Sequence, residues 1–281
     1  MNALVDALNQ YPLRLVTVAG RVQAFREAGQ GPALVLLHGI SSGSGSWVNQ
    51  LAALSSHFRV IAWDAPGYGD SAGLANPNPT AEDYAHALQS LLQALGVTQP
   101  LLLGHSLGAM VASAYAQAFP QHCAGLILAN PAQGYGAMDA DTRAEVAQKR
   151  PQLLQTLGHA GMAQVRARYL LAPEATADQI ALVQHGMLRL QQQGFEQASG
   201  VLAHDDIWQL LPSVAGPVGV IYGLDDGITP PEGVEALIRR LGAKGVQAYP
   251  LPAAGHASYI DQPVAFNQAV LAYTQLINIT K

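Results

Sequence analysis

The sequence predicts an α/β fold with a mostly parallel central sheet, helices on both faces of the sheet, and an inserted helical segment. Short apolar runs typical of buried parallel strands alternate with helical patterns over the first half of the chain. After Pro131 the strand-like runs stop, and only helical patterns follow as far as about Leu211, where the alternation resumes. Alternating strands and helices form parallel sheets whose two faces are covered by helices.

The strand-like runs begin with an alternating segment around Ala19 and Gly20, which predicts a β-hairpin. The later runs are mostly continuous and apolar, and they lie at residues 32–39, 58–67, 100–106, 124–131, 216–223 and 245–256. Each is short and most end near glycine or proline, as expected for buried strands that stop at one edge of a sheet.

Helical patterns lie between these runs. Thr80 and Asp83 are spaced like a capping box, which predicts a helix from there to about Leu95. A second helix is expected over 107–119. We therefore expect an α/β core made of residues 1–131 and 212–281, with residues 132–211 inserted as a helical cap subdomain.

Composition and charge exclude several classes of function. The chain has 281 residues, of which 49% are hydrophobic, and its formal net charge is −5, so a nucleic-acid partner is not expected. Cys123 is the single cysteine, which excludes an internal disulfide and a cysteine-based metal cluster. No run approaches the roughly 20 apolar residues of a membrane span, and the N-terminus lacks a signal-peptide pattern. We expect a cytoplasmic protein, and a homo-oligomer is compatible with the sequence.

Ser106 is the candidate nucleophile. It lies in the sequence Gly104-His105-Ser106-Leu107-Gly108, a G-x-S-x-G motif placed between a buried strand and a helix of small residues. The sharp strand-to-helix turn strains the serine backbone, and the glycines let the two elements pass closely. Its hydroxyl is then exposed beside the N–H groups of the helix N-terminus. The alternative is a serine that only caps the helix.

A serine nucleophile needs a base, and His256 is the predicted one. It follows the last strand-like run, at the carboxyl edge of the sheet where ligands gather in open α/β folds. His38 and His105 are expected to shape loops or pack. The remaining histidines are expected on the surface or in the helical insertion: His57, His86, His122, His159, His185 and His204.

An orienting acid is expected in the loop that follows the strand at 216–223. That loop holds Asp225 and Asp226, and it ends where Thr229 and Glu232 form the pattern of a second capping box. Both aspartates therefore lie at the carboxyl edge of the sheet, and local physics does not choose between them.

The chain resembles the α/β-hydrolase-fold serine hydrolases over nearly its whole length. The motifs that carry the resemblance occur in the family's order and are "LLHG" (36–39), "WDAPGYGDSA" (63–72), "GHSLGA" (104–109), "LILANP" (126–131), "YGLDDGITP" (222–230) and "AGHASYIDQP" (254–263). The resemblance implies that Asp226 is the acid, because it stands three residues after Gly223 and four before Pro230. It also implies an oxyanion hole made by the backbone N–H groups of Ile40 and Leu107.

The resemblance further implies a Ser-His-Asp mechanism that needs no metal and no cofactor. We expect a small carboxylic ester or an enol-lactone as substrate. The segment "HGISSGSGSW" (38–47) is similar to the loop of carbon–carbon bond hydrolases of aromatic degradation, which form an alternative, but it lacks their Gly-Pro-Gly core. Ala257 also stands where those enzymes have tryptophan. A non-catalytic small-molecule receptor on the same fold is the alternative of another class.

The cap is expected to determine the substrate. Its leucine, methionine, tyrosine and alanine content predicts a largely apolar pocket. The serines of residues 40–47 could contact substrate or face solvent. Four arginines lie in the helical patterns, and any could bind a carboxylate, although arginines on amphipathic helices usually face solvent. They are Arg143, Arg166, Arg168 and Arg189.

Overall fold

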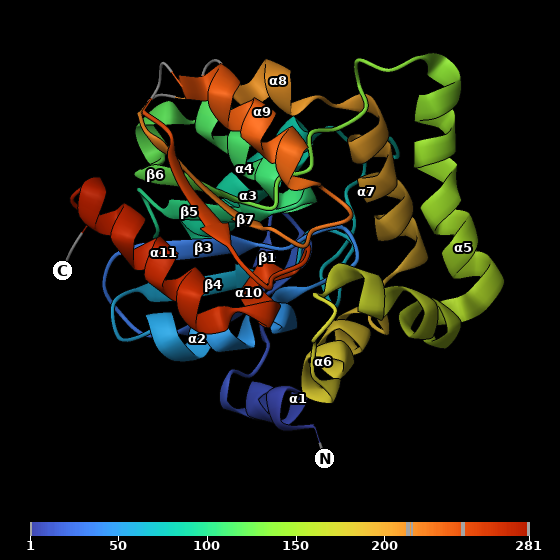
Figure 1. Cartoon of the computed structure of the whole chain (residues 1–281), viewed down its shortest axis with the longest axis horizontal. Helices are drawn as coiled ribbons and strands as arrows, with labels where there is room; N and C mark the ends of the chain where they lie inside the picture. The colour runs from blue at the N-terminus through green and yellow to red at the C-terminus, as the bar shows by residue number, and fades with distance from the viewer. Residues whose placement is uncertain (1, 212–213, 215, 243–244, 280–281) are drawn as a thin grey trace.

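A computed structural model describes residues 2–211, 214, 216–242 and 245–279 of the chain. Among these residues eight strands form one sheet in the order β1-β2-β4-β3-β5-β6-β7-β8 (Figure 1). The strands are β1 (Arg14–Val18), β2 (Arg21–Ala28), β3 (Ala33–Leu37), β4 (Arg59–Trp63), β5 (Leu101–His105), β6 (Gly125–Ala129), β7 (Val218–Gly223) and β8 (Gln247–Leu251). The two pairs that include β2 are antiparallel and the other five are parallel, which confirms the predicted mostly parallel sheet.

The predicted hairpin joins β1 to β2. Val18 pairs with Arg21 across the turn, and both intervening residues have positive φ, 49° at Ala19 and 76° at Gly20. Two consecutive residues with positive φ form a two-residue turn whose twist matches the right-handed twist of the strands that it joins.

Helices cover both faces of the sheet, as Figure 1 shows. On one face α2 (Val48–Leu54) packs against α11 (Pro263–Leu276), and on the other α3 (Ala81–Ala94) packs against α4 (Leu107–Ala118). The remaining helices that accompany the sheet are α1 (Ala3–Ala7), α9 (Pro231–Leu241) and α10 (Ser258–Asp261), with short 3-10 turns at Leu8–Gln10, Ser44–Trp47 and Pro120–His122. The predicted capping box at the start of α3 is confirmed.

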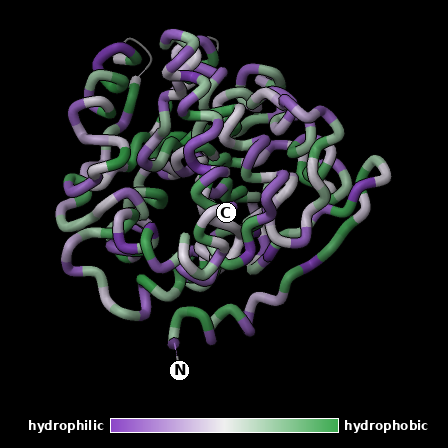
Figure 2. Tube along the Cα trace, turned by 90° about the vertical axis from the view of Figure 1, so that its right-hand side faces the viewer, coloured by the Kyte–Doolittle hydropathy of each residue, from purple (hydrophilic) through white to green (hydrophobic). Residues whose placement is uncertain are grey.

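The segment between β6 and β7 is helical over its described residues. It contains α5 (Ala140–Arg166), a 3-10 turn (Ala167–Leu170), α6 (Ala177–Met187), α7 (Gln192–His204) and α8 (Ile207–Leu210). Helix α5 packs against α6 and α7, and the three gather on the right-hand side of Figure 1, the side that faces the viewer in Figure 2. The division into a core and a cap stays a prediction, and residue 212, its expected boundary, lies outside the described residues.

Helix α5 is kinked. Gly158, with φ 64° and ψ 176°, interrupts the helical backbone, so that the segments before and after it run in different directions. A positive φ is readily adopted only by glycine, which explains why the break falls at this residue.

One predicted helix start is wrong. Thr229 and Glu232 were expected to form a capping box, but α9 begins at Pro231 with Pro230 in the N-cap position and no side-chain cap. The Thr229 hydroxyl instead donates a 2.6 Å hydrogen bond to the carboxylate of Asp226. A capping hydroxyl would accept from a backbone N–H, whereas here it is oriented as the donor to a charged acceptor, which forms a strong hydrogen bond.

Candidate active site

Ser106 lies at the turn between β5 and α4. Its backbone has φ 53° and ψ −117°, outside the regions that residues with a side chain normally occupy. The strain is maintained by hydrogen bonds on both sides, from Ser106 N–H to the carbonyl of Ala129 and from Ala132 N–H to the carbonyl of Ser106. Strained backbone of this kind clusters at functional sites.

The flanking glycines are required by close packing. A Cβ atom at Gly104 would lie 2.2 Å from the carbonyl oxygen of Gly108, and one at Gly108 would lie 2.3 Å from that of Leu37. Strand β5 and helix α4 therefore approach each other, and β3, more closely than any side chain allows. This is the steric reason for the motif that the sequence displays.

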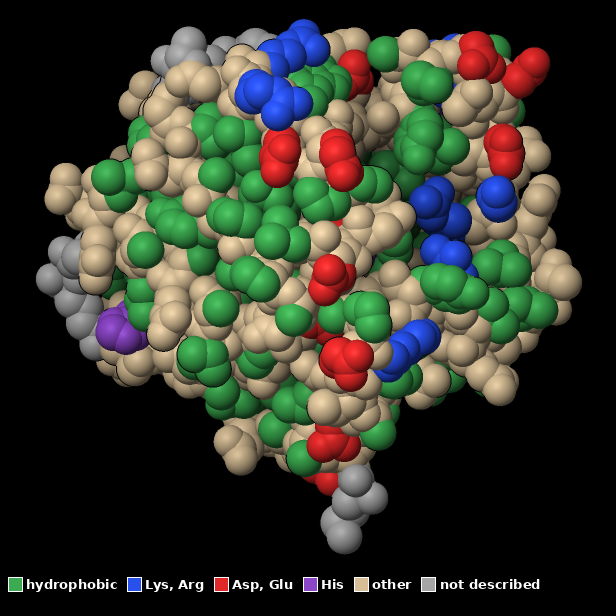
Figure 3. Space-filling view, in the orientation of Figure 1, with side chains coloured by type: hydrophobic (Ala, Val, Ile, Leu, Met, Phe, Trp, Pro, Cys, Tyr) green, Lys and Arg blue, Asp and Glu red, His purple; other side chains and the backbone are tan. Residues whose placement is uncertain are grey.

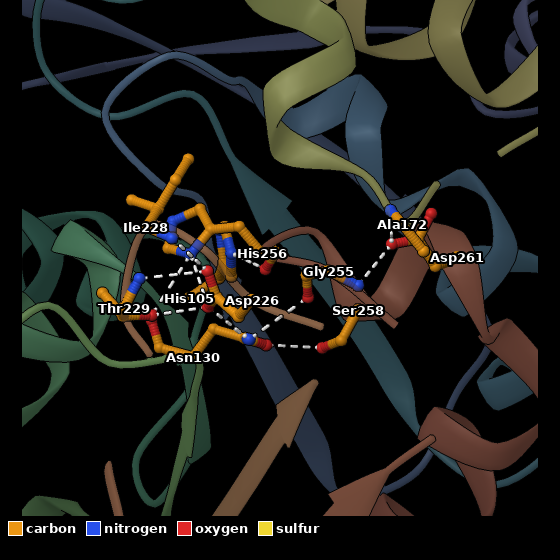
Figure 4. Close-up of polar contacts among 10 residues, drawn as sticks. All are labelled: His105, Asn130, Ala172, Asp226, Ile228, Thr229, Gly255, His256, Ser258 and Asp261. Carbon is orange, nitrogen blue, oxygen red and sulfur yellow. Dashed lines mark hydrogen bonds and ion pairs between the residues drawn. The ribbon is translucent and has the colours of Figure 1, made fainter. Parts of the chain in front are cut away.

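His256 and Asp226 lie together at the carboxyl edge of the sheet (Figure 4). Nδ1 of His256 donates a 2.9 Å hydrogen bond to Oδ2 of Asp226, and both side chains are almost completely buried. Because a carboxylate only accepts, the proton lies on Nδ1 and the Nε2 lone pair remains available as a base. Asp225, the neighbouring acid, is exposed to solvent, so the loop brings Asp226 alone to His256.

Asp226 accepts five hydrogen bonds. Oδ2 accepts from Asn130, Thr229 and His256, and Oδ1 accepts from the backbone N–H groups of Ile228 and Thr229. Burial would raise the pKa of this carboxyl group, but the hydrogen bonds from His256 and Thr229 outweigh it and hold the pKa well below its usual range. Asp226 is therefore a carboxylate at neutral pH.

Two residues of this arrangement were not anticipated from the sequence. Asn130, in the left-handed region at φ 42°, follows β6 and donates 2.8 Å to Asp226, while its Oδ1 accepts from the Ser258 hydroxyl at 2.6 Å. Thr229 approaches Nδ1 of His256 at 3.2 Å as well as donating to Asp226. The positive φ of a non-glycine residue is invisible in sequence, whereas the "LANP" segment at the end of a predicted strand was the available signal for Asn130.

The loop that carries His256 is held at both ends. Asp261 accepts hydrogen bonds of 2.8 Å from the N–H groups of Gly255 and Ala172, which ties the loop to the segment that follows the 3-10 turn at Ala167–Leu170 (Figure 4). Tyr259, three residues after His256, stacks on Trp47 with ring centroids 4.0 Å apart. These contacts restrict where the imidazole can lie.

His105 and His38 support the surrounding backbone. Nε2 of His105 lies 2.8 Å from the carbonyl oxygen of His256, and burial lowers the pKa of His105 to about 3. Nε2 of His38 accepts from Ala65 N–H, and burial lowers its pKa as well. Both rings are neutral, and His38 has the loop-shaping role expected of it.

Ser106 and His256 line the same cavity, which has a volume of about 230 Å³. Its walls come from the loop after β3, from the loops at the carboxyl edge of the sheet and from α5 to α7. Ser41 and Ser42 of the serine-rich loop reach it, whereas Ser44 and Ser46 do not. The aliphatic part of the wall is formed by Leu170, Val183, Leu202, Ile228 and Ile260.

Ile40 and Leu107, the expected oxyanion donors, also line this cavity. Leu107 is the first residue of α4, so its N–H has no acceptor within the helix. Among the described residues no acceptor is found for the N–H of Ile40, whose carbonyl accepts from the Tyr68 hydroxyl at 2.8 Å. Both N–H groups are therefore available to a bound oxygen.

The four arginines considered from the sequence have separate environments. Arg166 lines the cavity. Arg143 and Arg168 donate to backbone carbonyls, and Arg189 pairs with Asp70 at 3.3 Å. Arg150, which the sequence did not single out, also lines the cavity.

A comparison with protein families accounts for this arrangement. A family model described as "alpha/beta hydrolase fold" matches residues 32–263 of the chain. The chain belongs to this family. The predicted α/β-hydrolase fold is therefore confirmed.

Individual relatives include an esterase, a lactonase, putative carbamate hydrolases and uncharacterized proteins. An uncharacterized protein of Mycobacterium tuberculosis is 40% identical over 116 residues, which cover 41% of this chain and only 34% of that protein, so this chain matches about a third of it. A pimeloyl-[acyl-carrier protein] methyl ester esterase of Pectobacterium carotovorum is 29% identical over 86% of this chain and 94% of its own length. A 3-oxoadipate enol-lactonase of Acinetobacter baylyi is 26% identical over 88% of this chain and 90% of its own length.

Among solved structures, a thermophilic esterase from Thermogutta terrifontis superposes with a TM-score of 0.84 at 26% identity. The superposition covers 95% of this chain and 99% of the esterase. In the part of the chain that the structure describes, no helix is long and apolar enough to span a membrane.

Proposed function

We propose that this protein is a hydrolase that cleaves a small carboxylic ester or enol-lactone, with Ser106 as nucleophile, His256 as general base and Asp226 as the acid that orients it. One observation carries the proposal: His256 donates Nδ1–H to the buried Asp226 carboxylate and lines the same cavity as a serine with strained backbone. That is the division of roles by which a weakly acidic hydroxyl is activated at neutral pH.

The reaction proceeds in two steps. Ser106 Oγ attacks the substrate carbonyl carbon while Nε2 of His256 takes the hydroxyl proton, and collapse of the tetrahedral adduct returns that proton to the leaving alcohol or enol oxygen. Water then attacks the acyl-serine ester by the same route, with His256 taking a proton from water and returning it to Ser106. Asp226 keeps the imidazole in the required tautomer and stabilises its cation.

The N–H groups of Ile40 and Leu107 are the proposed oxyanion donors. Both line the cavity of Ser106, and neither is held by another acceptor among the described residues. Because a backbone donor is fixed before the reaction, it stabilises the developing charge without reorganisation, and loss of one such donor costs roughly 3–4 kcal/mol.

The ester or lactone assignment rests on the cavity and on the relatives. A volume of about 230 Å³ with an aliphatic wall fits a small substrate with an apolar body. The two long-coverage relatives reported above act, by their names, on a methyl ester and on an enol-lactone. Residues 132–211 would act as the cap over this cavity, since Arg150, Leu170, Val183 and Leu202 contribute to its wall.

Covalent labelling tests the proposal. A fluorophosphonate probe should label the native protein and fail to label Ser106→Ala, because only an activated serine attacks it. Labelling of Ser106→Ala at the native rate would show that another residue is the nucleophile, and no labelling of the native protein would favour a non-catalytic receptor; either result would contradict the mechanism. Assays with ethyl esters, lactones and meta-cleavage products, run side by side, would show whether the carbon–carbon bond alternative holds instead.

A further inference from the structure

The cavity of Ser106 has an uneven distribution of charge. Among the described residues that line it, Arg150 and Arg166 are the only ones with a permanent charge, and neither an aspartate nor a glutamate takes part in its wall. In Figure 3 several basic side chains lie on the right-hand, α5 side of the molecule; acidic side chains lie at the top of that side and down the middle, and further basic ones lie at the upper left. A cavity that faces two cations and no acid is suited to an anionic ligand.

The two guanidinium groups are also unpaired. Within the described residues, neither Arg150 nor Arg166 makes a side-chain hydrogen bond or an ion pair, although Arg166 lies 5.6 Å from the ring centroid of Tyr169. Other arginines of the chain do find carboxylates, namely Arg14, Arg59, Arg189 and Arg239. Ten N–H donors therefore remain unused at the edge of one cavity, since each guanidinium carries five.

Backbone geometry places both arginines at this cavity. They belong to the same helix and are separated by 16 positions, which in a straight helix would put them roughly 24 Å apart along the axis. The break at Gly158 lies between them and turns the second segment of α5, so that both side chains line one cavity. The kink therefore brings to one cavity two arginines that a straight helix would hold apart.

Two like charges at one half-buried site are unfavourable without a counter-charge. Burial lowers the pKa of Arg150, and the charge on Arg166 acts in the same direction. Arginine nevertheless remains protonated in proteins, so a bound anion would reduce the repulsion between the two groups. A carboxylate fits such a pair, because a guanidinium group binds it through two parallel hydrogen bonds.

We propose that Arg150 and Arg166 bind a carboxylate of the substrate, so that the enzyme prefers small esters or lactones that carry a carboxylate besides the carbonyl attacked by Ser106. This inference rests on the proposed function for the attacked carbonyl. Leu170, Val183 and Ile228 line the same cavity and would contact the aliphatic part of such a molecule. The largely apolar substrate expected from the sequence thus becomes a substrate with one anionic end.

A binding measurement tests the proposal without relying on turnover. The probes are the monoethyl esters of succinic, glutaric and adipic acid, each compared with a neutral ethyl ester in which an isopropyl group replaces the carboxylate. In the Ser106→Ala background, calorimetry should show at least tenfold tighter binding of one acid ester than of its neutral counterpart. Arg150→Gln and Arg166→Gln should each reduce that preference about tenfold or more.

Lys149→Gln is the matched control. It removes one positive charge from the same helix, but Lys149 is exposed, pairs with Glu145 and does not line the cavity. The acid-ester preference should stay within twofold in this variant. An equal loss in Lys149→Gln would mean that general charge, and not the arginine pair, attracts the acid, and equal binding of acid and neutral esters by Ser106→Ala would overturn the proposal.

Steady-state kinetics separate failure of this inference from failure of the proposed function. The native enzyme should show a higher kcat/KM for the acid ester than for the neutral ester, and the arginine variants should lose that ratio. Hydrolysis of both esters with equal kcat/KM would refute the carboxylate site and leave the serine mechanism standing. If neither ester is hydrolysed and fluorophosphonate labelling fails, the mechanism falls, while the binding preference still reports on the arginines.

Discussion

Asn130 donates a 2.8 Å hydrogen bond to Oδ2 of Asp226, the same oxygen that accepts the Nδ1 proton of His256. Asn130 is fully buried, and the Ser258 hydroxyl fixes its amide by donating to its Oδ1 at 2.6 Å. It does not line the cavity of Ser106, so it has no route to the substrate. In the proposed mechanism Asn130 is therefore a positioning residue, which would act by holding the carboxylate in place.

Asn130→Ala should lower kcat about 10- to 100-fold and leave KM nearly unchanged. A hydrogen bond to a charged group contributes about 1.5–3 kcal/mol, and this one orients the acid that orients the base. Asn267→Ala is the matched control, because Asn267 is also buried but bonds to Gln50, away from the cavity. It should lower the melting temperature without changing kcat; a raised KM in Asn130→Ala with kcat intact would contradict the assignment.

The adjacent aspartates should respond differently to the same substitution. Asp226→Asn removes the negative charge that fixes the imidazole tautomer, and a loss in kcat of roughly 10³- to 10⁴-fold is expected. Asp225→Asn should retain most of the activity, because Asp225 is exposed and its N–H, which bonds to the Ala254 carbonyl at 2.9 Å, is unaffected. The reverse pattern of activities would show that the acid has been misassigned.

The sequence predicts those parts of the site that local backbone geometry determines. The turn at Ser106 is recognisable because a buried strand, two glycines and a helix must follow one another without a break, and the glycines prove to be sterically required. His256 is recognisable because the loop after the last strand must lie at the carboxyl edge of the sheet. Both inferences use only neighbours along the chain.

The parts that the sequence does not predict depend on contacts between distant segments. Asn130 meets Asp226 across 96 positions of the chain, and no local pattern reveals this pairing. Thr229 has the spacing of a helix cap, yet a nearby carboxylate attracts its hydroxyl. Arg150 lies on a helix whose break at Gly158 changes which residues reach the cavity, and helical periodicity assumes a straight axis.

Gly108→Ala should destabilise the protein by about 1–3 kcal/mol or more. The new Cβ would lie 2.3 Å from the carbonyl oxygen of Leu37, so backbone must shift in a tightly packed region. Gly200→Ala serves as the opposite control: it lies within α7, and the added carbon would have no atom within 4 Å other than those of its chain neighbours and the nearby backbone of its own helix, so alanine should stabilise the helix by about 0.5–1 kcal/mol. Urea unfolding measures both, and a loss of stability in both variants would argue against the steric explanation.

Asp261 should make stability depend on pH in the opposite sense to Asp226. Asp261 is 8% exposed, and its Oδ1 has no partner among the described residues. Burial raises its pKa to about 6, although the N–H groups of Gly255 and Ala172 partly oppose this. An unfolded aspartate has a pKa of about 3.9, so between about pH 4 and 6 the folded state binds this proton more strongly than the unfolded chain does.

The stability that this proton confers is complete below about pH 4 and is lost as the pH rises through 6. Two units of pKa correspond to about 3 kcal/mol. Asp261→Asn keeps an acceptor for Gly255 N–H and cannot ionise, so it should not lose this stability as the pH rises. The free energy of unfolding of the variant minus that of the native protein should therefore increase by up to about 3 kcal/mol from pH 4 to pH 7. The lowered pKa of Asp226 acts in both proteins alike and cancels in this difference. A difference that stays constant with pH, measured by urea unfolding, would show that Asp261 is already ionised in the folded protein at pH 4.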